Sequence, residues 1–75
     1  MFEKIKALLV EELNVKAGDV TPDAELSGDL GINSLELADL TLLCEERFGV
    51  TIDDDDVRTF ITVGDLVSYL EGLDR

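Results

Sequence analysis

An all-α fold, a small bundle of four helices, is the class that this 75-residue sequence predicts. Three observations lead to it. Apolar residues recur at helical spacing in three segments, the segments are separated by glycine, asparagine and proline, and no stretch alternates like a strand. A chain of this length forms one domain, here residues 1–75, with a small core.

The first helix is expected over residues 2–13, where Phe2, Ile5 and Leu9 share one side, and Asn14 is suited to end it in a left-handed conformation. Residues 15–33 follow as a long loop without regular structure, broken by glycines and Pro22. Its apolar residues are expected to hold it against the bundle: Val15, Val20, Leu26, Leu30 and Ile32.

The second helix is expected over residues 34–48, with Asn33 as the N-cap, Glu36 completing a capping box and Gly49 as the stop. A short third helix follows Asp53–Asp56 and ends near Phe60. A fourth starts at Thr62, with Asp65 three residues later and apolar residues at helical spacing to Leu73. The bundle therefore has three main helices and one short one.

The composition excludes several classes of function. The formal charge is −12, and the absence of histidine removes Ser-His-Asp and Cys-His catalysis and imidazole ligation of metals, so an enzyme is not expected. The negative charge disfavours nucleic acid and anionic lipid, and no apolar run is long enough to span a bilayer. One cysteine, Cys44, and no signal peptide indicate a reducing, cytoplasmic setting. Charge repulsion favours a monomer.

The helix over residues 34–48 has apolar residues on two faces. Leu37, Leu40, Thr41, Cys44 and Phe48 form the stripe expected to face the core. Leu35, Ala38 and Leu42 lie almost opposite, between acidic residues. Scattered surface leucines are common, but three aligned with carboxylates favour a surface that binds proteins with basic faces. Its expected members are Leu35, Glu36, Ala38, Asp39, Leu42, Glu45 and Glu46.

Ser34 stands where the loop enters this helix. A serine at a helix start usually acts as the N-cap, but Asn33 can take that position and leave the Ser34 hydroxyl exposed at the first helical residue. The free N–H groups and dipole at a helix N-terminus favour an anion, so such a hydroxyl is suited to carry a phosphoester.

With these features the sequence resembles the acyl carrier protein family. The resemblance covers almost the whole chain and is strongest over Asp29-Leu30-Gly31-Ile32-Asn33-Ser34-Leu35-Glu36. It implies that Ser34 bears 4′-phosphopantetheine, that acyl groups are carried as thioesters in fatty-acid, lipid or polyketide-type biosynthesis, and that residues 34–48 meet a phosphopantetheinyl transferase and acyl-handling enzymes. The family usually has Asp where this chain has Asn33, which removes a carboxylate beside Ser34 and is expected to alter recognition by the transferase. Residues 35–43 also depart from the pattern common in housekeeping fatty-acid carriers, which favours a specialised carrier and leaves a fatty-acid role open.

One alternative function stays open at this point, and three other features have interpretations of their own. The acidic helix face also suits an adaptor or inhibitor of a basic protein, with Ser34 unmodified. The run Asp53–Asp56 suggests calcium, but it lacks the spacing, central glycine and terminal glutamate of an EF-hand, so a solvated acidic helix start is favoured and no metal site is expected. Cys44 is expected to be buried rather than reactive, and Tyr69 to pack at the rim with its hydroxyl in water.

Overall fold

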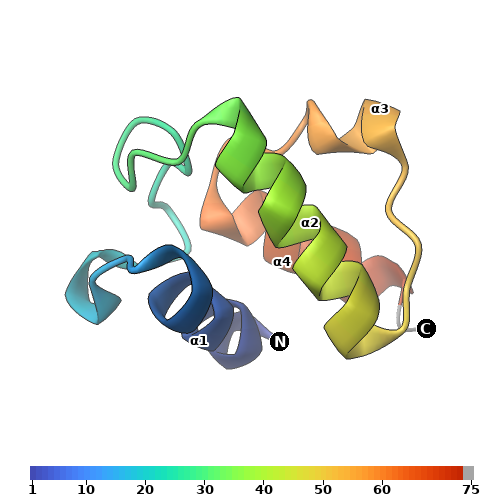
Figure 1. The fold of residues 1–75 in the computed structure, drawn as a ribbon, viewed down its shortest axis with the longest axis horizontal. Helices are drawn as coiled ribbons and strands as arrows, with labels where there is room; N and C mark the ends of the chain where they lie inside the picture. Colours follow the sequence, from blue (N-terminus) through green and yellow to red (C-terminus); the bar gives the residue numbers. More distant parts are fainter. Residues whose placement is uncertain (74–75) are drawn as a thin grey trace.

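The computed structural model describes residues 1–73, so residues 74–75 of the expected domain lie outside the described part. Its α-helices are α1 (Phe2–Leu13), α2 (Ser34–Phe48), α3 (Asp54–Val57) and α4 (Val63–Leu73), and a 3₁₀ turn, η1 (Ala17–Asp19), follows α1 (Figure 1). The prediction of three main helices and one short helix is confirmed. Among residues 1–73, no helix has the length and apolar character needed to cross a lipid bilayer.

The first two α-helices end as predicted. Asn14 has φ 57° and its amide donates to the Leu9 carbonyl, while Gly49 has φ 65° and its amide donates to the Glu45 carbonyl. Both residues are in the left-handed region, which glycine enters without strain and asparagine tolerates. At each stop the cap amide donates to one carbonyl near the end of the helix, and the left-handed residue turns the chain out of the helix.

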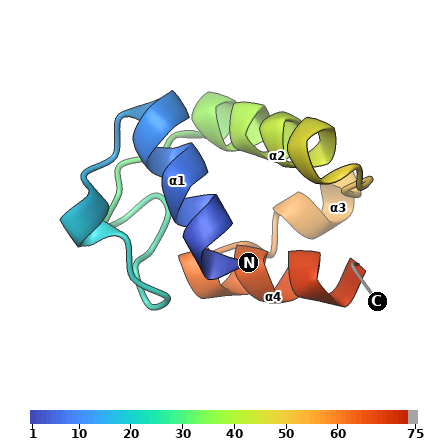
Figure 2. The same cartoon turned by 90° about the horizontal axis from the view of Figure 1, so that it is seen from below.

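The core lies between α1, α2 and α4, which are arranged around it in Figure 2. Ile5, Leu9, Leu40, Val63 and Leu66 have no exposed surface at all. Each fully buried side chain of this size contributes about 1.5–3 kcal/mol relative to exposure. The helices therefore depend mainly on one another for stability, since isolated helices of 11 to 15 residues are marginal in water.

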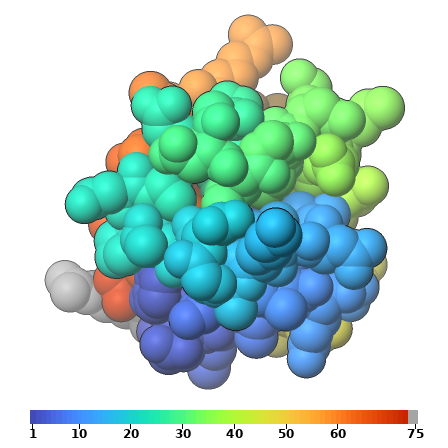
Figure 3. Space-filling model, turned by 90° about the vertical axis from the view of Figure 1, so that its left-hand side faces the viewer, coloured from blue at the N-terminus to red at the C-terminus, as the bar shows by residue number. Residues whose placement is uncertain are grey.

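The long loop is more ordered than the sequence predicted. It covers one face of the molecule between α1 and α2 (Figure 3), and it contains η1 and an isolated bridge between Glu25 and Thr62. The expected attachment through apolar side chains is confirmed: Val20, Leu26 and Ile32 are buried, and the other two pack against the core. The bridge was not foreseeable from local sequence, because its two residues lie on different elements.

Three backbone hydrogen bonds fasten this loop to the start of α4. The Val63 amide donates to the Ala24 carbonyl at 2.9 Å, and the Gly64 amide donates to the Pro22 carbonyl at 2.8 Å. The Leu26 amide also donates to the carbonyl of Ile61, just before the helix, at 2.9 Å. These contacts give the first amides of α4 the partners that a helix start otherwise lacks.

The third helix is shorter than expected and ends at Val57 rather than near Phe60. The Thr59 and Phe60 amides donate to the Asp56 and Val57 carbonyls, three residues back, so the chain continues in tighter turns. These turns bring Phe60 into the core, where it is 7% exposed. The fourth helix begins at Val63, with Thr62 as its cap, one residue after the predicted start.

Candidate functional site

The start of α2 has the predicted capping box. Asn33 has an extended backbone, and its Oδ1 accepts from the Glu36 amide at 2.8 Å. In return, Oε1 of Glu36 accepts from the Asn33 amide at 3.2 Å. Because Asn33 does the capping, the structural role that a serine most often has at a helix start is already filled.

Ser34 is the first helical residue and is exposed. Within residues 1–73, the Ser34 hydroxyl makes no hydrogen bond, and the Ser34 and Leu35 amides have no acceptor. These amides carry part of the positive end of the helix dipole. The exposed hydroxyl lies beside two backbone N–H groups that remain available as donors. This arrangement suits an oxygen that bears a phosphodiester, because these N–H groups could donate to the negatively charged phosphate.

The two faces of α2 differ as the sequence predicted. Leu40 and Cys44 are fully buried, whereas Leu35 is 78% exposed and Leu42 is 55% exposed. Ala38 is exposed as well. Large apolar side chains exposed in a row on one helix indicate an interaction surface more strongly than one isolated surface leucine does.

The four acidic residues of this face fall into two pairs. Asp39 and Glu46 are exposed, and their carboxylates make no hydrogen bond within residues 1–73. Glu36 and Glu45 are half-buried: Glu36 completes the capping box, and Oε2 of Glu45 accepts from the Ile52 amide at 2.8 Å. Both of the latter thus fix the backbone as well as adding negative charge.

Ile61 is an exposed apolar residue that the sequence did not single out. It is 61% exposed. Its carbonyl accepts from the Leu26 amide, and the Leu26 carbonyl accepts from the Ile32 amide at 2.9 Å, so backbone contacts connect it with the segment just before Ser34. In sequence Ile61 occupies the position before a helix cap, where an apolar side chain usually packs against the first turn, and only its exposure in the fold distinguishes it.

Cys44 is buried, as expected. Burial raises the pKa of its thiol from 9.0 to about 11, and the neighbouring Glu45 carboxylate adds to the shift. Since the thiolate is the reactive form, this side chain is a poor nucleophile at neutral pH.

Tyr69 corrects the expectation of a hydroxyl in water. The hydroxyl donates to Oδ2 of Asp56 at 2.8 Å, and the ring packs edge-on against Phe60 with centroids 5.1 Å apart. The hydrogen bond to Asp56 raises the Tyr69 pKa, because the hydroxyl can donate this bond only while it keeps its proton. This contact ties α3 to α4, and helical spacing within α4 alone could not reveal a partner on another element.

The aspartates at residues 53–56 serve the local fold. Oδ1 of Asp53 accepts from the Asp55 amide at 3.0 Å as the cap of α3, and Asp56 binds Tyr69. Across residues 1–73, no three His, Cys, Asp or Glu side chains are grouped closely enough to hold a metal ion.

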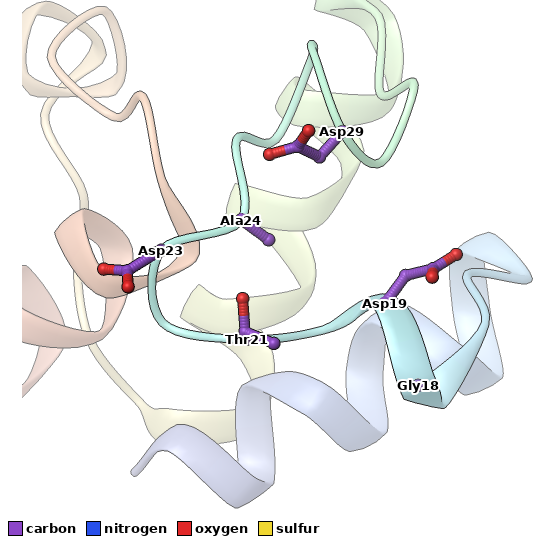
Figure 4. Close-up of a pocket in the computed structure, with 6 residues that line it drawn as sticks. All are labelled: Gly18, Asp19, Thr21, Asp23, Ala24 and Asp29. Atoms are coloured by element: carbon purple, nitrogen blue, oxygen red, sulfur yellow. The ribbon is translucent and has the colours of Figure 1, made fainter.

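A second acidic region lies in the long loop, where a pocket of about 450 Å³ opens (Figure 4). Its lining consists of Gly18, Asp19, Thr21, Asp23, Ala24 and Asp29. The carboxylates of Asp19 and Asp23 point away from one another in the close-up, and Oδ2 of Asp29 accepts from the Glu25 amide at 2.8 Å. The carboxylates thus do not converge on one centre.

An acidic helical bundle with an exposed, unbonded serine at the start of its second long helix has the features of a carrier module with a covalently attached phosphate-containing arm. Residues 3–70 match the family model described as "Phosphopantetheine attachment site". The chain is 48% identical over 71 residues to the acyl carrier protein of Helicobacter pylori strain ATCC 700392 / 26695, covering 95% of this chain and 91% of that protein. The proteins of strains G27 and J99, with the same name, are 46% and 44% identical over the same coverage.

This chain belongs to the acyl carrier protein family, and its cofactor is 4′-phosphopantetheine. The likeness extends over nearly the full length, in agreement with the all-helical fold and the acidic composition. The resemblance seen in the sequence is thereby confirmed, and the family is one of carriers.

Proposed function

We propose that Oγ of Ser34 is the attachment atom for 4′-phosphopantetheine and that residues 1–75 act as one carrier domain. The observation that carries this proposal is the exposed hydroxyl at the first position of α2, which has no hydrogen-bond partner within residues 1–73. The Ser34 and Leu35 amides beside it have no acceptor in that part of the chain either. When bound, the arm supplies a terminal thiol that holds acyl groups as thioesters.

The chain itself acts as the acceptor of the modification and not as an enzyme. Deprotonation of Ser34 needs a base, and the sequence has no histidine to provide one. The nearest partners of the helix start, Asn33 and Glu36, are occupied with each other in the capping box. A phosphopantetheinyl transferase therefore supplies the catalytic groups, and this chain supplies an accessible hydroxyl held at a rigid position.

The docking ridge is the exposed face of α2 that presents this hydroxyl to partners. It comprises Leu35, Glu36, Ala38, Asp39, Leu42, Glu45 and Glu46. Ile61, between α3 and α4, is a further exposed apolar side chain. Carboxylates around exposed apolar side chains favour partners with basic surfaces, because charge speeds encounter and sets orientation while apolar contact contributes affinity. These partners are the transferase and the enzymes that load, modify and remove acyl groups.

The cargo is an acyl group of fatty-acid, lipid or polyketide-type biosynthesis. The single cysteine is free and buried, which suits a reducing, cytoplasmic setting. The net charge of −12 opposes association of two acidic ridges, so the working form is a monomer. The departure of residues 35–43 from the pattern common in housekeeping fatty-acid carriers favours a specialised carrier.

Intact mass spectrometry tests the attachment atom. The purified chain is incubated with coenzyme A, magnesium and a broad-specificity phosphopantetheinyl transferase, alongside Ser34→Ala and the control Ser68→Ala, which removes another exposed serine. We expect a gain of one phosphopantetheinyl group in wild type and in Ser68→Ala, and none in Ser34→Ala. A gain in Ser34→Ala would refute the assignment, and failure of the folded wild-type chain with several transferases would favour an adaptor that acts unmodified.

A further inference from the structure

The docking ridge is bordered on its α1 side by a groove that the family assignment does not explain. The groove has a volume of about 310 Å³ and runs between the end of α1 and the middle of α2. Its lining consists of Glu12, Leu13, Asp39, Leu42, Leu43 and Glu46. The two helices lie beside each other here in both ribbon views (Figures 1 and 2).

The floor of the groove is apolar and accessible. Leu13 and Leu43 are only partly covered by the core, and Leu42 is 55% exposed at the edge. The three leucines come from two helices, so their exposure is a property of the assembled fold. An apolar floor of this kind suits one branched apolar side chain from outside.

The rim of the groove is acidic in a defined pattern. Asp39 and Glu46 are seven residues apart on α2, which places them on one face and about 10.5 Å apart along the axis. Both are exposed without a cationic partner within residues 1–73, whereas Glu12 on the α1 side is 3.1 Å from the Arg47 guanidinium. Two available carboxylates therefore lie on either side of the leucine floor.

Farther along the contact between α1 and α2, the charged side chains are basic instead of acidic. A second depression, lined by Lys4, Ala7, Leu8, Arg47 and Phe48, brings two basic side chains together in a molecule of net charge −12. The Glu12–Arg47 ion pair joins a residue from each lining. A basic segment of a partner is thus attracted to the groove and repelled by the second depression. This difference sets where along the contact between α1 and α2 the segment binds.

We infer that the groove between α1 and α2 receives an apolar side chain of a partner protein, flanked on that partner by two basic residues about two helical turns apart, as charge complementarity with Asp39 and Glu46 requires. This inference rests on the proposed carrier function and adds Leu13 and Leu43 to the docking ridge. Partners that use the groove would be held on the α1 side of the ridge, and those that do not would contact mainly Leu35 and Ala38.

A designed peptide serves as the probe. It is an alanine-based helix with one central leucine, a lysine three residues before it and a lysine four residues after it, and the control peptide has serine for leucine. In ¹⁵N-labelled protein we expect the amide shifts of Leu13 and Leu43 to move most with the leucine peptide and to stay with the control. Largest shifts around Leu35 and Ala38, equal effects of both peptides, or no binding at millimolar peptide would each overturn the inference.

Matched variants separate the groove from general charge attraction. Asp39→Asn with Glu46→Gln removes the rim carboxylates, and Glu3→Gln with Glu71→Gln removes two exposed carboxylates elsewhere, so both variants lose the same charge. We expect the first to weaken peptide binding about three- to tenfold, as for two exposed ion pairs, and the second by less than about twofold. Equal weakening in both variants would overturn the inference.

The same experiment distinguishes this inference from the proposed attachment site. Ser34→Ala leaves the groove intact, so we expect it to bind the leucine peptide as wild type does. If the peptide binds in the groove while the wild-type chain is not modified by any transferase, the groove stands and the attachment proposal fails. If modification occurs at Ser34 but the peptide does not bind, the attachment stands and the groove inference fails.

Discussion

The starts of α2 and α4 are built alike, and we propose that only the start of α2 carries a modification. Both have a reciprocal capping box, Asn33 with Glu36 in α2 and Thr62 with Asp65 in α4, with cap distances of 2.8 and 3.1 Å. In α4 the hydroxyl itself is the cap, the next residue is the fully buried Val63, and the first two amides donate to loop carbonyls.

In α2 the cap is an amide side chain, so the hydroxyl falls one residue later and is exposed at Ser34, beside amides that the fold leaves open. A hydroxyl at the cap position is therefore committed to the fold, whereas one at the next position is available for chemistry. The position of serine or threonine relative to the cap, and not its presence near a helix start, separates the two roles.

The largest effect should come from Ser34→Ala. We expect complete loss of phosphopantetheine attachment with a melting temperature within about 3 °C of wild type, because the hydroxyl makes no hydrogen bond within residues 1–73. Intact mass and thermal unfolding by circular dichroism measure the two quantities. A large drop in melting temperature would mean that Ser34 contributes to the cap after all, and the contrast between the two helix starts would be lost.

Gly64→Ala tests the closed helix start. A Cβ atom there would lie 2.9 Å from the Pro22 carbonyl oxygen, in contact with backbone that has little freedom to move. We expect the free energy of unfolding to fall by about 1–2 kcal/mol, as for overpacking of a tight site. Urea unfolding measures it, with Gly72→Ala as the control because no atom of the described residues lies within 4 Å of its added Cβ. Equal stability of the two variants would show that the loop yields at this contact.

Thr62→Ala should have effects opposite to those of Ser34→Ala, with lower stability and unchanged attachment. Removing the cap hydroxyl leaves the Asp65 amide without its acceptor and should lower stability by about 1 kcal/mol. Attachment at Ser34 should proceed at the wild-type rate, since the modification site is on another helix. Chemical denaturation and a transferase time course test the two halves, and slowed attachment in a fully folded variant would contradict the separation of roles.

Asp65→Asn tests the same cap through pH. Hydrogen bonds from the Thr62 and Ile61 amides hold the Asp65 pKa below 3.8 in the folded chain. A lowered folded-state pKa stabilises the fold above the unfolded-state value, and this stability is lost as pH falls through the folded-state pKa. Relative to wild type, Asp65→Asn should therefore show less loss of stability between about pH 4 and lower pH. Denaturant unfolding at each pH measures this. An equal loss of unfolding free energy on acidification in wild type and Asp65→Asn would refute it.

The smallest effect is expected from Asn33→Asp. Aspartate caps a helix about as well as asparagine, so stability should change by less than about 0.5 kcal/mol. The added carboxylate lies beside Ser34, where it should raise the rate of modification by a transferase with a basic surface a few-fold through faster encounter. Progress curves at low and high salt measure this, and an advantage that persists unchanged at high salt would speak against an electrostatic cause.

Much of the fold was predictable because its signals are local. The stops at Asn14 and Gly49, the cap at Asn33 and the opposed faces of α2 all depend on residues within a few positions of each other. The contacts that were missed join distant segments: the bridge between Glu25 and Thr62, and the hydrogen bond of Tyr69 to Asp56. Helical periodicity carries no information about which element faces a side chain from outside its own helix.

The candidate site likewise has parts that the sequence predicted and parts that it did not. Ser34 and the ridge followed from the helix register and from the family resemblance, since both lie within one continuous segment. Ile61 did not, because its exposure depends on the loop and the short turns around it. The groove lined by Leu13 and Leu43 also needed the assembled helices, since neither leucine is distinctive in its own sequence neighbourhood.

The buried Cys44 has a consequence for labelling chemistry. Its thiol, with a pKa of about 11, is the only sulfhydryl that the sequence encodes. After modification, the folded protein presents one readily ionised sulfhydryl to solvent, at the tip of the arm, while the encoded one stays protonated inside the bundle. Thiol reagents such as maleimides should therefore report, in the native protein and without mutation of the cysteine, the fraction of chains that bear the arm with its thiol free of an acyl group.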